Sequence, residues 1–231
     1  MTSINSTDPE VTLKLLEDSP FYSGQIVACA IEQPKAPAYA SIPQSIHPLL
    51  LSQLQQMGIV KLYTHQVQTF ETSNADLDCV VTTGTGSGKT LCYQIPALHR
   101  ILQEPSARGL FIYPTKALAQ DQLAKMNAIV PAGIRVATYD GDTPKHQRSA
   151  IRKEANLILT NPDMLHVGIL PNHSAWTKFL RSLRFIAIDE MHAYSGVFGS
   201  HVALVLRRLL RLCEWSGANP RIVATSATIR N

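Results

Sequence analysis

The feature that most constrains this chain is a glycine-rich stretch between an apolar run, Cys79–Thr82, and a predicted helix that starts near Gly88. Glycines adopt backbone angles that other residues resist, so several N–H groups can converge on one anion. The following helix aims the positive end of its dipole at the same point. We therefore predict a phosphate-binding loop. Its residues are Thr83, Gly84, Thr85, Gly86, Ser87, Gly88, Lys89 and Thr90.

Two side chains of this loop have separate predicted tasks. Lys89 is placed to reach the β- and γ-phosphates of ATP, and the Thr90 hydroxyl is placed to hold Mg²⁺. A flexible glycine-serine loop is the alternative interpretation. It is disfavoured because Gly-Lys-Thr stands where a strand gives way to a helix, which is the context that the phosphate-loop motif requires. Thr83 stands where the general pattern has a glycine.

The length and composition indicate a globular chain without a membrane segment. The 231 residues suffice for one sizeable α/β domain with an arm, and 45% of them are hydrophobic against 16% charged. A formal net charge of +4 permits a polyanionic partner without requiring one. No basic segment precedes an apolar core at the start, and no run is long enough to cross a membrane. We therefore expect a cytoplasmic protein, associated with the nucleoid if the source is bacterial.

The cysteines give no sign of a metal site or of a disulfide framework. Cys29, Cys79, Cys92 and Cys213 are scattered and form no C-x-x-C pair. Reduced thiols are the simplest interpretation.

From Asp78 onward, apolar strand-like runs alternate with helical stretches. The apolar runs are residues 79–82, 110–113, 135–139, 157–160, 185–188 and 222–225, and the helical stretches are 89–102, 117–130, 145–155, 176–183 and 201–215. Continuous apolar strands separated by helices predict an α/β fold, with a mainly parallel sheet covered by helices on both faces. Such sheets bind ligands beyond the carboxyl ends of their strands.

Residues 1–45 are predicted to form a partly disordered N-terminal extension, and residues 46–231 the domain that contains the phosphate-binding loop. Residues 1–23 are polar and turn-rich, which indicates a poorly ordered arm with one helical turn. An apolar strand-like piece follows over residues 26–39, where prolines stop any regular helix. We expect a helix over residues 48–57 that ends at Gly58, and a second helix that runs from a Thr64 cap to Glu71.

A pair of carboxylates follows the apolar run at residues 185–188. Asp189 would hold Mg²⁺ directly or through water, and Glu190 would orient or deprotonate the attacking water. An acidic helix cap is the plainer alternative, and the phosphate loop upstream argues against it. His192 by itself is typical of a hydrogen-bonded structural histidine.

Small hydroxyl residues and one glutamine complete the predicted nucleotide site. Ser226 and Thr228 follow another apolar run, so their hydroxyls emerge on the same edge of the sheet as Asp189. They can bond to Glu190, to His192 or to a neighbouring domain, and so couple nucleotide state to movement. Gln66 has an amide that can both donate to and accept from the edge of adenine.

Three further segments follow strands and begin helices or turns. Hydroxyls, a glycine N–H and helix N-termini spaced along one edge suit a row of phosphates and read no base sequence. Ordinary helix capping explains each segment equally well when it is taken alone. The predicted nucleic-acid contacts are Pro114, Thr115, Lys116, Gly141, Asp142, Thr160, Asn161 and Pro162. The basic stretch around Lys145, Arg148, Arg152 and Lys153 is more typical of a solvated helix face.

Taken together, these motifs in this order resemble the first RecA-like domain of superfamily-2 DEAD/DEAH-box helicases, whose pattern also fits Thr83. Within that superfamily, the Leu-Tyr-Thr-His-Gln segment ending at Gln66 and the Asp-Glu-Met-His-Ala-Tyr segment starting at Asp189 look like the mitomycin-repair-factor helicases and their RecQ-related eukaryotic relatives. The resemblance implies ATP-dependent 3′-to-5′ movement on single-stranded DNA, linked to repair. It covers about residues 45–231.

The resemblance also implies a second RecA-like domain, in cis or in trans, with an arginine finger that completes the ATP site. The sequence stops three residues after Thr228, so we expect a helicase fragment that binds nucleotide with little hydrolysis. Three alternatives stay open. They are an RNA helicase, a non-catalytic ATP-dependent interaction module, and a small-molecule kinase built on a phosphate loop.

Overall fold

The computed structural model describes residues 9–30 and 36–228. The chain divides into two compact units, and the boundary along the sequence falls between Pro37 and Ala38. The first unit contains one helix, α1 (Pro9–Glu17), among its described residues; this is longer than the single turn expected there. Residues 26–30 are apolar but form no strand. The expectations for residues 1–8 and 31–35 lie outside the described residues.

The second unit begins before the predicted domain boundary at residue 46. Strand β1 (Tyr39–Ala40) pairs antiparallel with β2 (Leu62–Tyr63), so residues 38–45 belong with the larger unit. This small pair lies beside the helices that precede the phosphate loop. It fixes the chain segment that leads into them.

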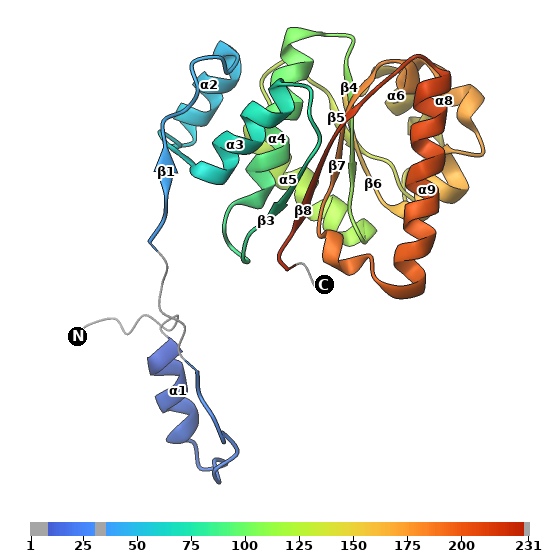
Figure 1. Ribbon diagram of the computed structural model, residues 1–231. Coiled ribbons are helices and arrows are strands. Elements are labelled where there is room, and N and C mark those ends of the chain that lie inside the picture. The colour runs from blue at the N-terminus through green and yellow to red at the C-terminus, as the bar shows by residue number, and fades with distance from the viewer. Residues whose placement is uncertain (1–8, 31–35, 229–231) are drawn as a thin grey trace. The chain divides into compact units, whose positions relative to one another are not determined.

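A six-stranded parallel sheet forms the centre of the larger unit (Figure 1). Its spatial order is β3-β8-β7-β4-β6-β5, and each neighbouring pair is parallel. The strands are β3 (Cys79–Thr82), β4 (Arg108–Ile112), β5 (Val136–Thr138), β6 (Leu157–Thr160), β7 (Leu183–Ile188) and β8 (Arg221–Ser226). Each lies within two residues of its predicted bounds, which confirms the predicted parallel sheet.

Helices connect the strands and cover both faces of the sheet. They are α2 (Pro48–Gln56), α3 (Thr64–Asn74), α4 (Lys89–Gln103), α5 (Lys116–Ile129), α6 (Lys145–Glu154), α7 (Pro162–Met164), α8 (His173–Arg181) and α9 (Gly196–Trp215). A π-helical stretch (Leu165–Ile169) continues α7, and a short 3₁₀ turn (Met191–Ala193) precedes α9.

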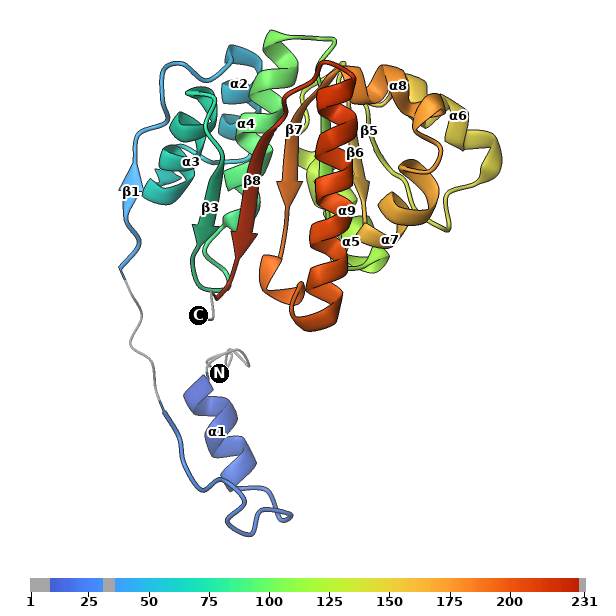
Figure 2. The ribbon, with the colours of Figure 1, turned by 45° about the vertical axis from the view of Figure 1, so that its right-hand side comes forward.

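Alternate side chains of the strands enter two separate cores. Phe111 packs with α4 and α5 on one face, whereas its neighbours Leu110 and Ile112 pack with Trp176 of α8 and Leu209 of α9 on the other. The strands are therefore apolar on both faces, as expected for a parallel sheet between two helical layers. Figures 1 and 2 show the strands between these layers.

Three helix starts differ from prediction, and the simplest case is α8, which begins at His173 instead of residue 176. Helix α9 begins at Gly196 instead of residue 201, because a tight turn after Tyr194 starts the helix early. Gly196 has a φ of 58°, and a Cβ on Gly199 would lie 2.4 Å from the Tyr194 carbonyl oxygen, so this turn requires glycines. Helix α3 is capped at Tyr63, and the predicted Thr64 cap is wrong since Thr64 is already helical.

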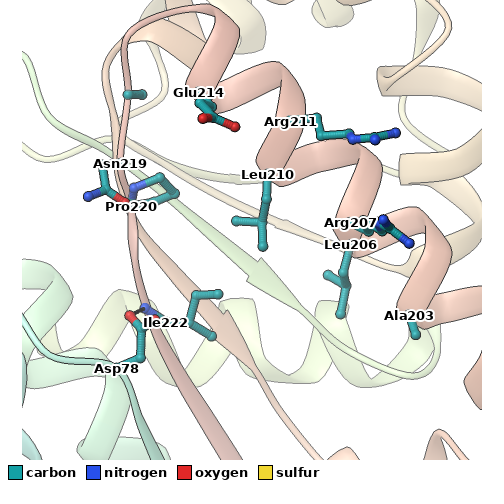
Figure 3. A pocket seen from close by; sticks show the side chains of 11 residues that line it. Asp78, Ala203, Leu206, Arg207, Leu210, Arg211, Glu214, Asn219, Pro220 and Ile222 are labelled. Carbon is teal, nitrogen blue, oxygen red and sulfur yellow. Dashed lines mark hydrogen bonds between the residues drawn. The ribbon is translucent and has the colours of Figure 1, made fainter.

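A groove of about 820 Å³ runs between α9 and β8 on one face of the sheet (Figure 3). Leu206 and Leu210 of α9 face Ile222 of β8 across it. Asp78 and Pro220, which precede β3 and β8, line the same groove, so it lies towards the amino ends of the strands. It is therefore at the opposite end of the sheet from the predicted site. In the described residues, no helix is long and apolar enough to cross a membrane.

Candidate functional site

The phosphate loop connects β3 to α4 with two glycines in the left-handed region. Gly86 and Gly88 have φ values of 74° and 75°, which side chains disfavour, and this explains why glycine is needed there. The Thr83 and Ser87 hydroxyl oxygens lie 2.6 Å apart across the loop. A contact between two side chains thus joins the start of the loop to its end. The backbone N–H groups of the loop lie next to the N-terminus of α4.

Lys89 folds back over this loop. Its Nζ donates to the carbonyl oxygen of Thr83 at 2.9 Å and to that of Gly84 at 2.8 Å, and the residue is only 9% exposed. The ammonium group therefore sits within the loop where a phosphate would bind. A bound phosphate would have to compete with these two carbonyl oxygens for the same N–H donors.

Gln66 is buried and joins α3 to the phosphate loop. Its Oε1 accepts from the Tyr63 N–H at 2.9 Å, and its Nε2 donates to the Gly88 carbonyl oxygen at 2.9 Å. The contact is close, since a Cβ on Gly88 would lie 2.7 Å from Nε2. Each end of the amide already has one backbone partner. The amide has the capacity for one further hydrogen bond at each end.

A stack of three rings beside Gln66 was missed by the sequence reasoning. The ring centroids of Tyr39 and Tyr63 are 4.9 Å apart and those of Tyr63 and His65 are 5.5 Å apart, with interplanar angles of 14° and 11°. His65 Nε2 lies 3.0 Å from the Ser87 carbonyl oxygen, which ties the stack to the loop. The sequence does indicate part of this stack, because the two rings of Tyr63 and His65 flank Thr64 just before Gln66.

Asp189 is held by buried hydroxyl groups at the end of β7. Its Oδ2 accepts from Tyr93 Oη at 3.0 Å, and its Oδ1 accepts from the Thr225 hydroxyl and from the Glu190 N–H. The Tyr93 and Tyr113 hydroxyl oxygens are 3.3 Å apart. The carboxylate that would hold a metal is thereby fixed in orientation. No sequence signal connects Tyr93 with a residue 96 positions away.

The tyrosines around Asp189 stay protonated. Burial raises the pKa of Tyr93 well above its usual value, and the nearby Tyr113 and Asp189 raise it further. Burial also raises the pKa values of Tyr113 and Tyr194. The Tyr93 hydroxyl can therefore donate its proton to the Asp189 carboxylate in a hydrogen bond.

The second carboxylate, Glu190, has a left-handed backbone with a φ of 50°. Its Oε2 lies 3.3 Å from His192 Nδ1. The same nitrogen lies 3.5 Å from Ser226 Oγ, and Thr228 accepts from that hydroxyl through its carbonyl oxygen at 2.5 Å. The structure thus brings together the acidic segment and the Ser-Ala-Thr segment, as the sequence predicted.

The sheet places these motifs side by side. Strand β8 lies between β3 and β7, and the Thr83 N–H donates to the Ser226 carbonyl oxygen at 3.3 Å. The phosphate loop and Asp189 therefore flank the end of β8 at the carboxyl edge of the sheet. Among the described residues no cluster of three or more His, Cys, Asp or Glu could hold a metal ion. Thr90 and Asp189 would instead share a cation with phosphate oxygens.

The predicted nucleic-acid contacts differ in how free their side chains are. Thr115 caps α5 by accepting from the Leu118 N–H, and Asn161 caps α7 by accepting from the Met164 N–H. Lys116 forms an exposed ion pair with Asp142 at 2.7 Å. Both residues of the pair remain open to solvent.

Other predicted contacts are engaged inside the protein. Thr160 is fully buried, and its hydroxyl donates to the Tyr139 carbonyl oxygen, so that hydroxyl is not free for a nucleic acid. Pro162 is also buried. Arg148 donates to the carbonyl oxygens of Thr143 and Gly141, so it holds the turn at residues 140–143 instead of forming a free basic patch.

The parallel sheet, the phosphate loop and the paired carboxylates at the end of β7 define a RecA-like P-loop domain. A family model described as DEAD/DEAH box helicase matches residues 63–231. The chain belongs to the DEAD/DEAH box helicase family.

Individual relatives agree with this assignment. The chain is 45% identical to the ATP-dependent helicase YprA of Bacillus subtilis over 202 residues, and 39% identical to the ATP-dependent helicase HRQ1 of Saccharomyces cerevisiae over 236 residues. These alignments cover 86% and 99% of the chain but only 27% and 22% of the relatives. A crystal structure of the DUF1998 helicase MrfA bound to DNA and AMPPNP matches with a TM-score of 0.82 at 44% identity, covering 87% of this chain and 29% of that one.

Proposed function

We propose that this chain is the ATP-binding half of an ATP-dependent DNA helicase or translocase. The observation that carries the proposal is the grouping of the phosphate loop, Asp189, Glu190 and His192 around the end of β8. ATP binding would draw this domain against a second RecA-like domain over a single strand, and hydrolysis would release it. The chain spans about a quarter of the relatives described above, so the activity of the whole protein belongs to the proposal.

The residues at the carboxyl edge fit an ATP·Mg²⁺ complex. Lys89 would exchange its two loop carbonyls for phosphate oxygens, and Thr90 and Asp189 would hold Mg²⁺. The bound cation would neutralise phosphate charge. Glu190, one residue further on, would orient the attacking water or accept its proton.

Gln66 would bind adenine with the N–H and the lone pair that its backbone contacts leave free. Tyr39 ends the ring stack and is 52% exposed, so its outer face is open to a flat ring. Stacking would add apolar contact to the polar contacts of Gln66.

The proposed polymer is single-stranded DNA. The relative MrfA was crystallised with DNA, and this similarity supports DNA over RNA. Direction 3′ to 5′ and a place in DNA repair follow from the resemblance to that branch. Lys116, Gly141, Asp142 and the helix starts after β4 and β6 would contact phosphates without reading bases.

Nucleotide turnover by the 231-residue chain, with and without single-stranded DNA, tests this proposal. We expect nucleotide binding with slow turnover, because the site would be completed by an arginine of a second RecA-like domain. Adding that domain in trans should raise turnover, and Glu190→Gln should abolish the increase while nucleotide binding persists.

Absence of nucleotide binding would contradict the proposal. Fast DNA-stimulated turnover without the second domain would contradict the need for it, and competition between DNA and RNA strands separates the two polymers.

A further inference from the structure

A second groove, of about 430 Å³, lies between one face of α9 and α7 with the π-helical stretch that continues it. We call it the α7–α9 groove. Its volume falls within the range of small-molecule sites, about 300–1,000 Å³. The residues that matter for its chemistry are Pro162, His166, Phe198, His201, Val202 and Arg208.

The groove has an apolar floor and one exposed aromatic wall. Val202 is buried at 4% exposure and forms part of the floor, whereas the ring of Phe198 is 42% exposed. An exposed phenylalanine at the start of a helix offers a flat face to another ring. The pairing of an apolar floor with an open aromatic face suits a planar, partly apolar group.

One guanidinium, two imidazoles and one carboxylate line the mouth of the groove. His166, His201 and Arg208 line it together with a single carboxylate, Asp163. Within the described part of the chain, none of these four side chains forms a hydrogen bond or an ion pair. The unpaired guanidinium of Arg208 and the two imidazoles are therefore free to contact an anion, and phosphate is the anion that such groups favour.

The groove lies at the edge of the sheet where the proposed strand would run. Helix α7 starts at Pro162, two residues after the end of β6, and Phe198 lies in the first turn of α9, which follows β7. Figure 2 shows α7 beside α9, towards the end of the sheet to which the strand arrows point. The groove therefore continues the row of predicted phosphate contacts at Asn161 and Pro162.

We propose that the α7–α9 groove receives one unpaired base of the bound strand, stacked on Phe198, while His166, His201 and Arg208 contact the flanking phosphates. This inference rests on the proposed function, because it assumes that a single strand follows the carboxyl edge of the sheet. Stacking on an aromatic face is tolerant of sequence, since every base has a flat face. The groove would thus add affinity without specificity.

A ring contact links the groove to the segment that carries Glu190. The ring centroids of Phe198 and Tyr194 are 5.8 Å apart, and Tyr194 comes four residues after Glu190. The Tyr194 hydroxyl is buried without a hydrogen-bond partner among the described residues. A base stacked on Phe198 would press on this tyrosine, and hence on the segment that carries Glu190.

A comparison of two strands of equal charge tests the inference. The affinity of the chain for a single-stranded oligothymidylate is measured beside its affinity for an abasic sugar-phosphate strand of the same length. Phe198→Ala should weaken binding of the oligothymidylate about fivefold or more and leave binding of the abasic strand unchanged. Phe198→Tyr should restore the difference. Arg208→Gln should weaken both strands and lower the salt dependence of binding by about one phosphate contact.

Val197→Ala is the matched control, because Val197 is 76% exposed, adjacent to Phe198 and not part of the groove. Thermal unfolding of each variant shows whether it is folded. If Phe198→Ala is folded and binds both strands as the unaltered chain does, the inference is overturned, and a peptide becomes the better occupant. If the unaltered chain binds neither strand, the proposed function itself fails, which is a distinct result.

Discussion

His192 Nδ1 lies 3.3 Å from Glu190 Oε2 and 3.4 Å from the backbone nitrogen of Ala227. One ring nitrogen cannot serve both neighbours in the same state. With a lone pair, Nδ1 accepts from the Ala227 N–H; with a proton, it donates to the Glu190 carboxylate. His192 therefore stands between the acidic segment after β7 and the Ser-Ala-Thr segment after β8, and it can bond to one of them at a time.

This relationship predicts that His192 couples the two ligands. His192→Ala should leave nucleotide affinity in the absence of DNA within about twofold, because the histidine does not touch the phosphate loop. It should remove the change in nucleotide affinity that single-stranded DNA produces in the unaltered chain. Titration of a fluorescent ATP analogue with and without DNA measures both quantities. An undiminished effect of DNA in the variant would refute the coupling role.

Lys89 should dominate phosphate binding. Lys89→Met removes a charged donor that already lies within the loop, and we expect ATP affinity to fall at least tenfold, which is about 1.4 kcal/mol. Isothermal titration calorimetry measures the change. Lys125→Met is the matched control, since Lys125 forms only an exposed ion pair with Asp121 on α5. Equal losses in the two variants would indicate a general effect of charge instead of a phosphate contact.

Gly199 should tolerate no side chain. A Cβ at this position would meet the Tyr194 carbonyl oxygen at 2.4 Å, so Gly199→Ala should lower the free energy of unfolding by about 1–3 kcal/mol. Helix propensity alone would predict a gain, because alanine is the better helix former. Urea unfolding measures whether Gly199→Ala lowers or raises the free energy of unfolding. Gly141→Ala is the control, since its added Cβ meets nothing within 4 Å and should change stability little.

The sequence predicted those features that depend on short-range pattern. Apolar runs marked each strand of the sheet, and the glycines of the phosphate loop marked the turn from β3 to α4. The carboxyl edge followed from the parallel order of the strands, and for this reason the sequence alone could predict that Asp189 and Ser226 lie near each other.

Contacts between distant side chains could not be predicted in this way. Tyr93 binds Asp189 only because α4 crosses the face of β7, and one sequence carries no sign of that crossing. Thr160 is the last residue of β6, and its side chain points into the protein, where its hydroxyl donates to the Tyr139 carbonyl oxygen just beyond the end of β5. The direction of a hydroxyl at a strand end thus depends on its neighbouring strand, which local sequence does not record.

His99 should make stability depend on pH below neutrality. This histidine is 3% exposed on α4; its Nδ1 accepts from the His47 N–H, and its Nε2 has no partner among the described residues. Burial, with smaller effects of His47 and Arg100, lowers its pKa from 6.5 to about 4. Protonation would place an unpaired charge beside the ring of Phe70, whose centroid is 5.0 Å away. Folded His99 therefore binds its proton only at a lower pH than a solvent-exposed histidine does.

The direction in which pH changes the free energy of unfolding follows from the pKa values of His99 in the unfolded and folded states. Unfolded His99 binds its proton near pH 6.5 and folded His99 only near pH 4, so the unfolded state binds more protons throughout this range. The free energy of unfolding should fall as the pH is lowered from 6.5 to 4, by up to about 3 kcal/mol from this residue. His99→Gln keeps an acceptor for the His47 N–H but cannot titrate. Urea unfolding at several pH values should show a flatter profile for the variant, whereas parallel profiles would mean that His99 is protonated equally in both states.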